Sequence, residues 1–206
     1  MLEPVKTPQS PFKLFVAIMV LTVFLSAYQP INATLWFAHS ITVLVALVVL
    51  VATHKRFAFS PLVYFLMWVY GTAMMVGAHF TYEQEPLFMW LQDTFELSRN
   101  YYDRFTHFWQ GVVPAMIIRE LLIRHAVVVK CHWLPVITIA LTFAISAAYE
   151  LFEWWFALLS GKTAEISLGM QGDVWDTQWD MLLALIGAVL AVIFLSKLHD
   201  KQLNSR

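Results

Sequence analysis

Six stretches of this 206-residue chain are apolar and close to the length that a helix needs to cross a membrane. A hydrocarbon core about 30 Å thick requires roughly 20 residues per helical span. Lipid offers the backbone no hydrogen-bond partners, so such stretches fold as helices. Hydrophobic residues make up 60% of the chain and charged residues 13%, unlike a soluble domain. The sequence therefore predicts an all-α, polytopic transmembrane bundle with spans at about 12–28, 33–53, 61–80, 105–122, 132–159 and 178–198.

The chain contains no internal repeat, low-complexity tract or long linker, so residues 1–206 are expected to form a single membrane-embedded domain. Residues 81–102 mix acids with large apolar side chains, which indicates an amphipathic helix lying on the membrane. Residues 160–175 carry glycines at 161, 169 and 172 and are expected to form a loop that folds over a site.

The distribution of Lys and Arg predicts the orientation of the chain, because basic residues near span ends stay in the cytoplasm. Ten basic residues lie on one side of the predicted spans and three on the other, which places both termini in the cytoplasm. The ten are Lys6, Lys13, Lys55, Arg56, Arg119, Arg124, Lys130, Lys197, Lys201 and Arg206, and the three are Arg99, Arg104 and Lys162.

Charge and cysteine content exclude several classes of function. The net charge of −1 argues against nucleic acid as a partner, because nucleic acid binding requires a clustered basic surface. Cys131 is the sole cysteine, so the chain can form neither an internal disulfide nor a cysteine-based zinc site. Membrane lipids are the expected partners, and the sequence leaves the oligomeric state open.

Acidic and imidazole side chains gather at the predicted outer ends of three spans. An ionised group in the hydrocarbon costs several kcal/mol unless it is paired or hydrated, so these groups are expected to face the bundle interior. Residues three or four apart share one face of a helix. The sequence contains three such pairs: Asp103 with His107, Glu150 with Glu153, and Asp176 with Asp180.

Two chemistries suit such a cluster, and the sequence does not choose between them. Carboxylates and imidazole can hold a divalent metal, with oxygen ligands favouring Mg²⁺, Ca²⁺ or Mn²⁺ and histidine shifting the preference toward Zn²⁺, Fe²⁺ or Mn²⁺. Crowded, buried carboxyl groups can instead supply a general acid beside a general base without a metal. The candidate metal ligands are Glu150, Glu153, Asp176, Asp180 and His79.

The chain resembles a known set of bacterial membrane proteins at these pairs. The patterns Asp103-Arg-Phe-Thr-His107-Phe, Glu150-x-x-Glu153 and Asp176-x3-Asp180-x6-Gly187 resemble the motifs of the VanZ-like superfamily over the last three spans. The run Gly172-Asp-Val-Trp-Asp-Thr-Gln-Trp-Asp180, with Tyr149-Glu150-Leu-Phe-Glu153, resembles the YjdF type of inner-membrane protein over most of the chain.

The resemblance implies a multi-pass protein of the bacterial inner membrane with some connection to the cell envelope. By position, Asp103, His107, Glu150 and Asp180 match the acids and imidazole of the VanZ-like motifs. The chain departs from that pattern at three positions: Arg104 replaces Lys, Glu153 replaces Gln, and Ala184 replaces Asn.

The first functional hypothesis is an enzyme-like site at the periplasmic leaflet that acts on a lipid or lipid-linked envelope substrate. Glu150, with Asp176 and Asp180, would bind a metal or polarise water. His107 would act as acid or base, oriented by Asp103. Arg104 would bind an anionic headgroup, because guanidinium recognises phosphate bidentately, and Trp175 and Trp179 would line the headgroup pocket.

Two alternatives remain open at this stage. The acids could bind and pass a cation or proton in a transport module, although the inner halves of the spans lack acids apart from Glu120 at the interface. The polar groups could also form a structural network in a membrane protein with no turnover.

Overall fold

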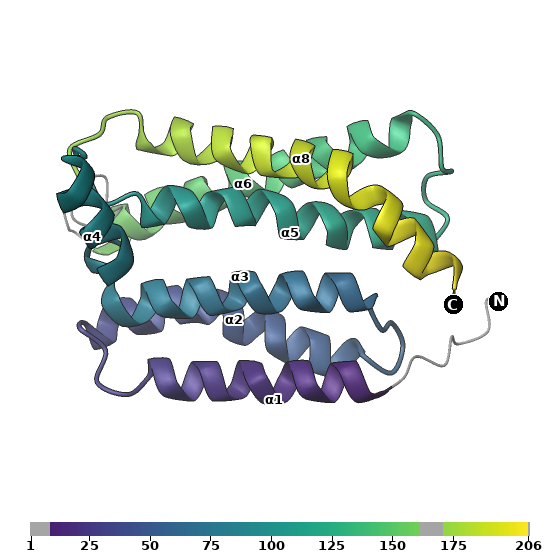
Figure 1. Cartoon of the computed structure of the whole chain (residues 1–206), viewed down its shortest axis with the longest axis horizontal. Helices are drawn as coiled ribbons and strands as arrows, with labels where there is room; N and C mark the ends of the chain where they lie inside the picture. Colours follow the sequence, from purple (N-terminus) through teal and green to yellow (C-terminus); the bar gives the residue numbers. More distant parts are fainter. Residues whose placement is uncertain (1–8, 161–170, 206) are drawn as a thin grey trace. The chain divides into compact units, whose positions relative to one another are not determined.

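The computed structural model describes residues 9–160 and 171–205, and all regular structure within those ranges is helical (Figure 1). The helices are α1 (Gln9–Ser26), α2 (Ala33–Thr53), α3 (Pro61–Phe80), the short 3₁₀ helix η1 (Tyr82–Gln84), α4 (Pro86–Phe95), α5 (Tyr102–Arg124), α6 (Trp133–Ser160) and α8 (Asp176–Asn204). Lys6, Lys162 and Arg206 of the orientation argument lie outside the described residues, as do Gly161 and Gly169 of the predicted loop.

Four of the described helices are long and apolar enough to cross a membrane: α2, α3, α6 and α8. A shorter apolar helix covers Phe12–Ser26. The remaining predicted span, α5, has 23 residues and is about 35 Å long, but it carries five charged residues and is less apolar. The prediction of an all-α, polytopic membrane protein is confirmed.

Local capping explains why two spans begin where the sequence predicts. The side-chain oxygen of Asn32 accepts hydrogen bonds from the backbone amides of Thr34 and Leu35 at 3.0 and 3.1 Å, which caps α2. Ser60 caps α3 in the same way, and Pro61 occupies the first turn, where no amide hydrogen is needed. Consequently α2 and α3 have the predicted bounds.

The chain divides into two compact units. The first unit contains residues up to Thr81 together with Phe194–Arg206. Within it, α3 packs against both α1 and α2. The amide of Leu62 donates a hydrogen bond to the side-chain oxygen of Gln202 at 3.0 Å, which joins the start of α3 to the end of α8.

The second unit covers Tyr82–Ile193 and contains the sequence-predicted polar pairs of α5, α6 and α8. Here α5 packs against α6 and also touches the first part of α8. A Cβ atom added at Gly111 would lie 1.9 Å from the carbonyl oxygen of Ala184, and one added at Gly187 would lie 2.1 Å from that of Phe108. The backbones of α5 and α8 are therefore in direct contact, as at other small-residue helix interfaces in membranes. The assignment of residues 1–206 to a single domain stays a prediction.

The close contact between α5 and α8 predicts that Gly111→Ala destabilises the protein by about 1–3 kcal/mol or more, because a backbone cannot move aside as a side chain can. Gly71→Ala is the matched control. Its Cβ would meet the flexible end of the Met19 side chain at 2.7 Å, so a smaller loss is expected. Thermal unfolding of the two purified variants in detergent measures the loss of stability in each. An equal loss in both variants would contradict the close contact between α5 and α8.

Candidate functional site

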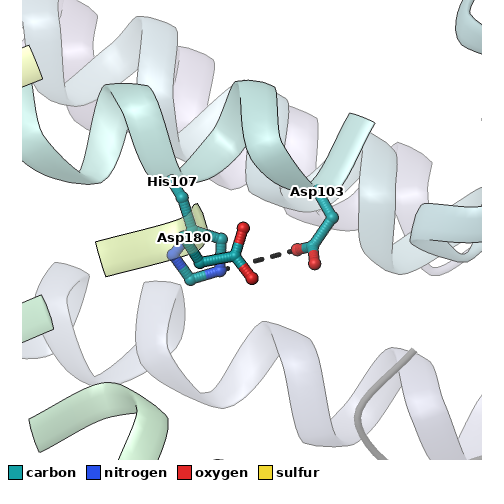
Figure 2. Close-up of side chains that lie close together, drawn as sticks. All are labelled: Asp103, His107 and Asp180. Atoms are coloured by element: carbon teal, nitrogen blue, oxygen red, sulfur yellow. Dashed lines mark ion pairs between the residues drawn. The ribbon is translucent and has the colours of Figure 1, made fainter. Parts of the chain in front are cut away.

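Three of the predicted site residues meet where α5 and α8 begin. Asp103 and His107 lie in the first turns of α5, and Asp180 lies in the second turn of α8. Figure 2 shows the three side chains pointing toward one another. One ligand atom from each residue lies within 4.8 Å of the other two. Atoms at this separation can share one metal ion, since metal–ligand bonds of about 2.0–2.6 Å place ligand atoms no more than about 5 Å apart.

The imidazole of His107 connects α5 to α6. Its Nε2 atom lies 3.6 Å from an oxygen of Asp103, and its Nδ1 atom lies 3.6 Å from an oxygen of Glu150. The two carboxylates therefore flank one ring, and Tyr149 contacts the same ring edge to face at a centroid distance of 5.9 Å. Within the described part of the chain, His107 is the ion-pair partner found for both Asp103 and Glu150.

Several polar atoms at this locus are buried without a hydrogen bond. His107, Glu150 and Asp180 are 4%, 7% and 3% exposed. The atoms Nδ1 of His107, Oε1 of Glu150 and Oδ1 of Asp180 have no hydrogen-bond partner among the described residues. Buried polar atoms are rarely left in this state, so each of these atoms has unused capacity to bind a ligand, an ion or a water molecule.

Two arginines neutralise the other two aspartates of the region. Arg99 is paired with Asp176, and Arg104 with Asp173. Weaker cross contacts complete the set, with Arg99 3.9 Å from Asp173 and Arg104 3.8 Å from Asp176. Two positive and two negative charges thus balance in this network, which leaves the carboxylates around His107 as the unbalanced group.

Hydrogen bonds to the backbone hold the segment before α8 against the segment before α5. The side chain of Gln171 accepts from the amide of Asn100 at 3.0 Å and donates to its carbonyl at 3.1 Å. Gln171 and Gly172 both have positive φ, and Gly172 adopts this conformation without strain. The amide of Trp175, with Arg104 and Arg99, holds the pKa of Asp173 below its usual value, so Asp173 is ionised at neutral pH.

Arg104, a predicted headgroup residue, contacts two aromatic rings. Its guanidinium lies 5.3 Å from the ring centroid of Trp179 and 5.0 Å from that of Tyr101, distances typical of cation–π contacts. Trp175 and Trp179 are both exposed. Arg104 is therefore held by an aspartate and two aromatic rings.

The remaining predicted metal ligands lie outside the group of three. Asp176 is engaged by Arg99. Glu153 lies one turn beyond Glu150 on α6. His79 belongs to the first unit, where its Nδ1 donates a hydrogen bond to the carbonyl of Ser26 at 2.9 Å. Their role as ligands stays a prediction.

Arg99, Asn100 and Gln171 are not among the site residues that the sequence predicts. The sequence predicts a site role for Arg104, whereas Arg99 is the more buried arginine, 3% exposed, and pairs with Asp176. Helical spacing could not find these residues because they lie in the segments that precede α5 and α8. The available signal was a buried aspartate whose nearest cation on its own helix, Lys197, lies 21 residues away.

The helices and their buried polar groups define an integral membrane protein of the polytopic helical class. Residues 12–201 match the family model described as "Predicted membrane protein (DUF2238)", and the chain belongs to this family. It is 42% identical over 169 residues to "Inner membrane protein YjdF" of Escherichia coli (strain K12), a match that covers 82% of this chain and 81% of the relative. No solved structure matches the chain. The chain is thus an inner-membrane protein with several apolar helices, as the resemblance implies.

The buried Arg99–Asp176 pair predicts a large stability loss when one partner is removed. Arg99→Met leaves Asp176 without its main partner and should cost about 3–5 kcal/mol. Arg99→Met combined with Asp176→Leu removes both charges and should recover most of that loss. Thermal unfolding of the two single variants and the double variant measures the coupling. Additive losses in the double variant would show that the pair does not form.

Proposed function

We propose that Asp103, His107 and Asp180, with Glu150 beside them, form a cation-binding acid–base site that acts on a lipid or lipid-linked envelope substrate. The observation that carries the proposal is the meeting of three donor atoms from two helices within 4.8 Å. The unpartnered buried atoms of the same residues support it.

The charges at the site favour a bound cation. Three carboxylates surround His107, which can carry one positive charge at most, while Arg99 and Arg104 balance Asp173 and Asp176. A divalent cation would offset the remaining negative charge at low cost in a partly dry site. One imidazole with carboxylate oxygens suits Mn²⁺, Zn²⁺ or Fe²⁺. Such an ion would polarise a substrate oxygen or activate a water molecule.

The proposed role of the other groups follows from their positions. Glu150 faces the Nδ1 atom of the imidazole, so it would orient His107 as a ligand and would itself be the acid or base beside the cation. Arg104, Trp175 and Trp179 would meet an anionic headgroup, with Arg104 exchanging Asp173 for a phosphate. The exposed indoles suit the interfacial region where such headgroups lie.

We also propose that the site faces the periplasm and that both termini are cytoplasmic. The excess of Lys and Arg in the connections on the opposite side supports this orientation. The sequence alternative, cation- or proton-linked transport, would use the same carboxylates.

Binding of Mn²⁺ to the purified protein tests the cation site. Asp180→Asn and His107→Gln should each weaken the affinity by tenfold or more, as measured by calorimetry. Asp93→Asn is the matched control, because Asp93 is an exposed acid on α4. An equal affinity for Mn²⁺ in all three variants would contradict the proposed cation site.

Turnover is tested separately in cells. Glu150→Gln and His107→Ala should reproduce the envelope lipid profile of a deletion strain, while their abundance in the membrane stays normal. Mass spectrometry of extracted lipids and lipid-linked precursors gives the profile. A wild-type profile in both variants would contradict an enzymatic role.

Reporter fusions test the orientation. Green fluorescent protein at the C-terminus should fluoresce, because it folds in the cytoplasm. Alkaline phosphatase, which is active only after export, should be active when fused in the segment 96–98 and inactive at the C-terminus. The reverse pattern would place the site in the cytoplasm.

A further inference from the structure

A line of buried hydroxyl groups runs along α6 from the candidate site past the middle of the helix toward its first turns. Thr138, Thr142 and Ser146 are each at most 1% exposed, and the same four-residue spacing continues to Glu150. Residues four apart lie on one face of a helix, so the three hydroxyls form a single row, called here the hydroxyl column. From Glu150 to Thr138 the column extends about 18 Å, more than half of a hydrocarbon core about 30 Å thick.

The hydroxyl column has unused hydrogen-bonding capacity. Serine and threonine within a helix normally bond back to the carbonyl four residues earlier, as Thr142 does to Thr138 at 2.8 Å. The hydroxyls of Thr138 and Ser146 have no partner among the described residues. Buried polar groups in this state are normally satisfied by internal water.

Helix α5 adds polar groups at the same depth. It runs antiparallel to α6, because His107 meets Glu150 near one end and Ile118 and Leu122 cluster with Leu134 near the other. Between these two levels lies Gln110, whose side-chain oxygen is buried and has no partner in the described part of the chain.

Pro114 frees a backbone carbonyl of α5 close to the Gln110 side chain. It lies inside the helix and has no amide hydrogen, so the carbonyl of Gln110 loses its helical hydrogen bond. In membrane helices, carbonyls freed in this way are satisfied by neighbouring hydroxyls or by water.

We propose that the hydroxyl column and Gln110 line a file of water molecules that runs inward from the candidate site and is a path for protons. The apolar cluster of Ile118, Leu122 and Leu134 closes the file at its inner end. The path lets protons move between the candidate site and the inner part of α6, which is distinct from cation binding, and apart from Glu150 it rests on α5 and α6 residues that the proposed cation site does not use.

Water access is tested with silver ions, which are small enough to follow water and react with thiolates. Cys131 is the sole cysteine and is exposed, so Cys131→Ser gives a clean background. Ser146→Cys and Thr142→Cys are compared with Leu141→Cys and Ile145→Cys, whose positions are on the same helix at the same depth but 43% and 46% exposed on its outer surface. The full chain is reconstituted in vesicles, treated with Ag⁺, then denatured and alkylated.

We expect Ag⁺ to react with the cysteines in the hydroxyl column, and so protect them from later alkylation, at least tenfold faster than with the lipid-facing cysteines. Equal rates at all four positions would mean that the hydroxyls only pack against neighbouring helices, and would overturn the proposal. The Mn²⁺ binding experiment does not depend on this result, so the water file and the cation site can be contradicted independently.

Proton conduction is tested by extending the column. Leu134→Thr places a hydroxyl one turn beyond Thr138, within the apolar cluster, and should raise proton uptake by reconstituted vesicles at least tenfold over wild type. Adding Ser146→Ala and Thr142→Val should return uptake to the wild-type rate. Leu134→Val is the apolar control. Uptake that is unchanged by Leu134→Thr, or unchanged by the two further substitutions, would overturn the path.

Discussion

Gly111 and Gly187 let the backbones of α5 and α8 touch, and the arrangement of the candidate site depends on that contact. His107 lies one turn before Gly111, and Asp180 lies about two turns before Gly187, so the glycines set the distance between the two side chains. A larger residue at either glycine would clash with the facing backbone and push the two helices, and with them the site residues, further apart. Close packing of small residues, which alone carries little functional information, here positions the polar groups.

Charge balance divides the acids of the second unit into two groups with different physical roles. Arg99 and Arg104 neutralise Asp173 and Asp176, and this network anchors the segment before α8. The carboxylates around His107 form no such pair with an arginine, and the buried atoms Oε1 of Glu150 and Oδ1 of Asp180 have no hydrogen-bond partner within the described residues. The arginine–aspartate network would act as a rigid scaffold, and the polar atoms around His107, which lack hydrogen bonds, would form the ligand site beside it.

The sequence predicted the helices well because their limits are local. Hydrophobic length, Asn32 and Ser60 as caps and Pro61 in the first turn define α2 and α3 without reference to the rest of the fold. The pairing of Asp103 with His107 follows from helical spacing in the same way. The sequence could not show that Arg99 reaches Asp176, because that contact joins positions 77 residues apart. The hydroxyl column was not predicted either, because serine and threonine are common inside membrane helices and their burial depends on how the helices pack.

A crosslink between α5 and α8 tests the central claim most directly. In the Cys131→Ser background, Asp103→Cys and Asp180→Cys together should be joined covalently by a short bifunctional thiol reagent, because the two native carboxylates approach within 4.8 Å. Proteolytic cleavage between α5 and α6 would then leave the two fragments connected on a gel. Asp103→Cys paired with a cysteine at the lipid-facing position Leu182 should not crosslink. Fragments that separate equally for both pairs would contradict the meeting of these helices at a shared site.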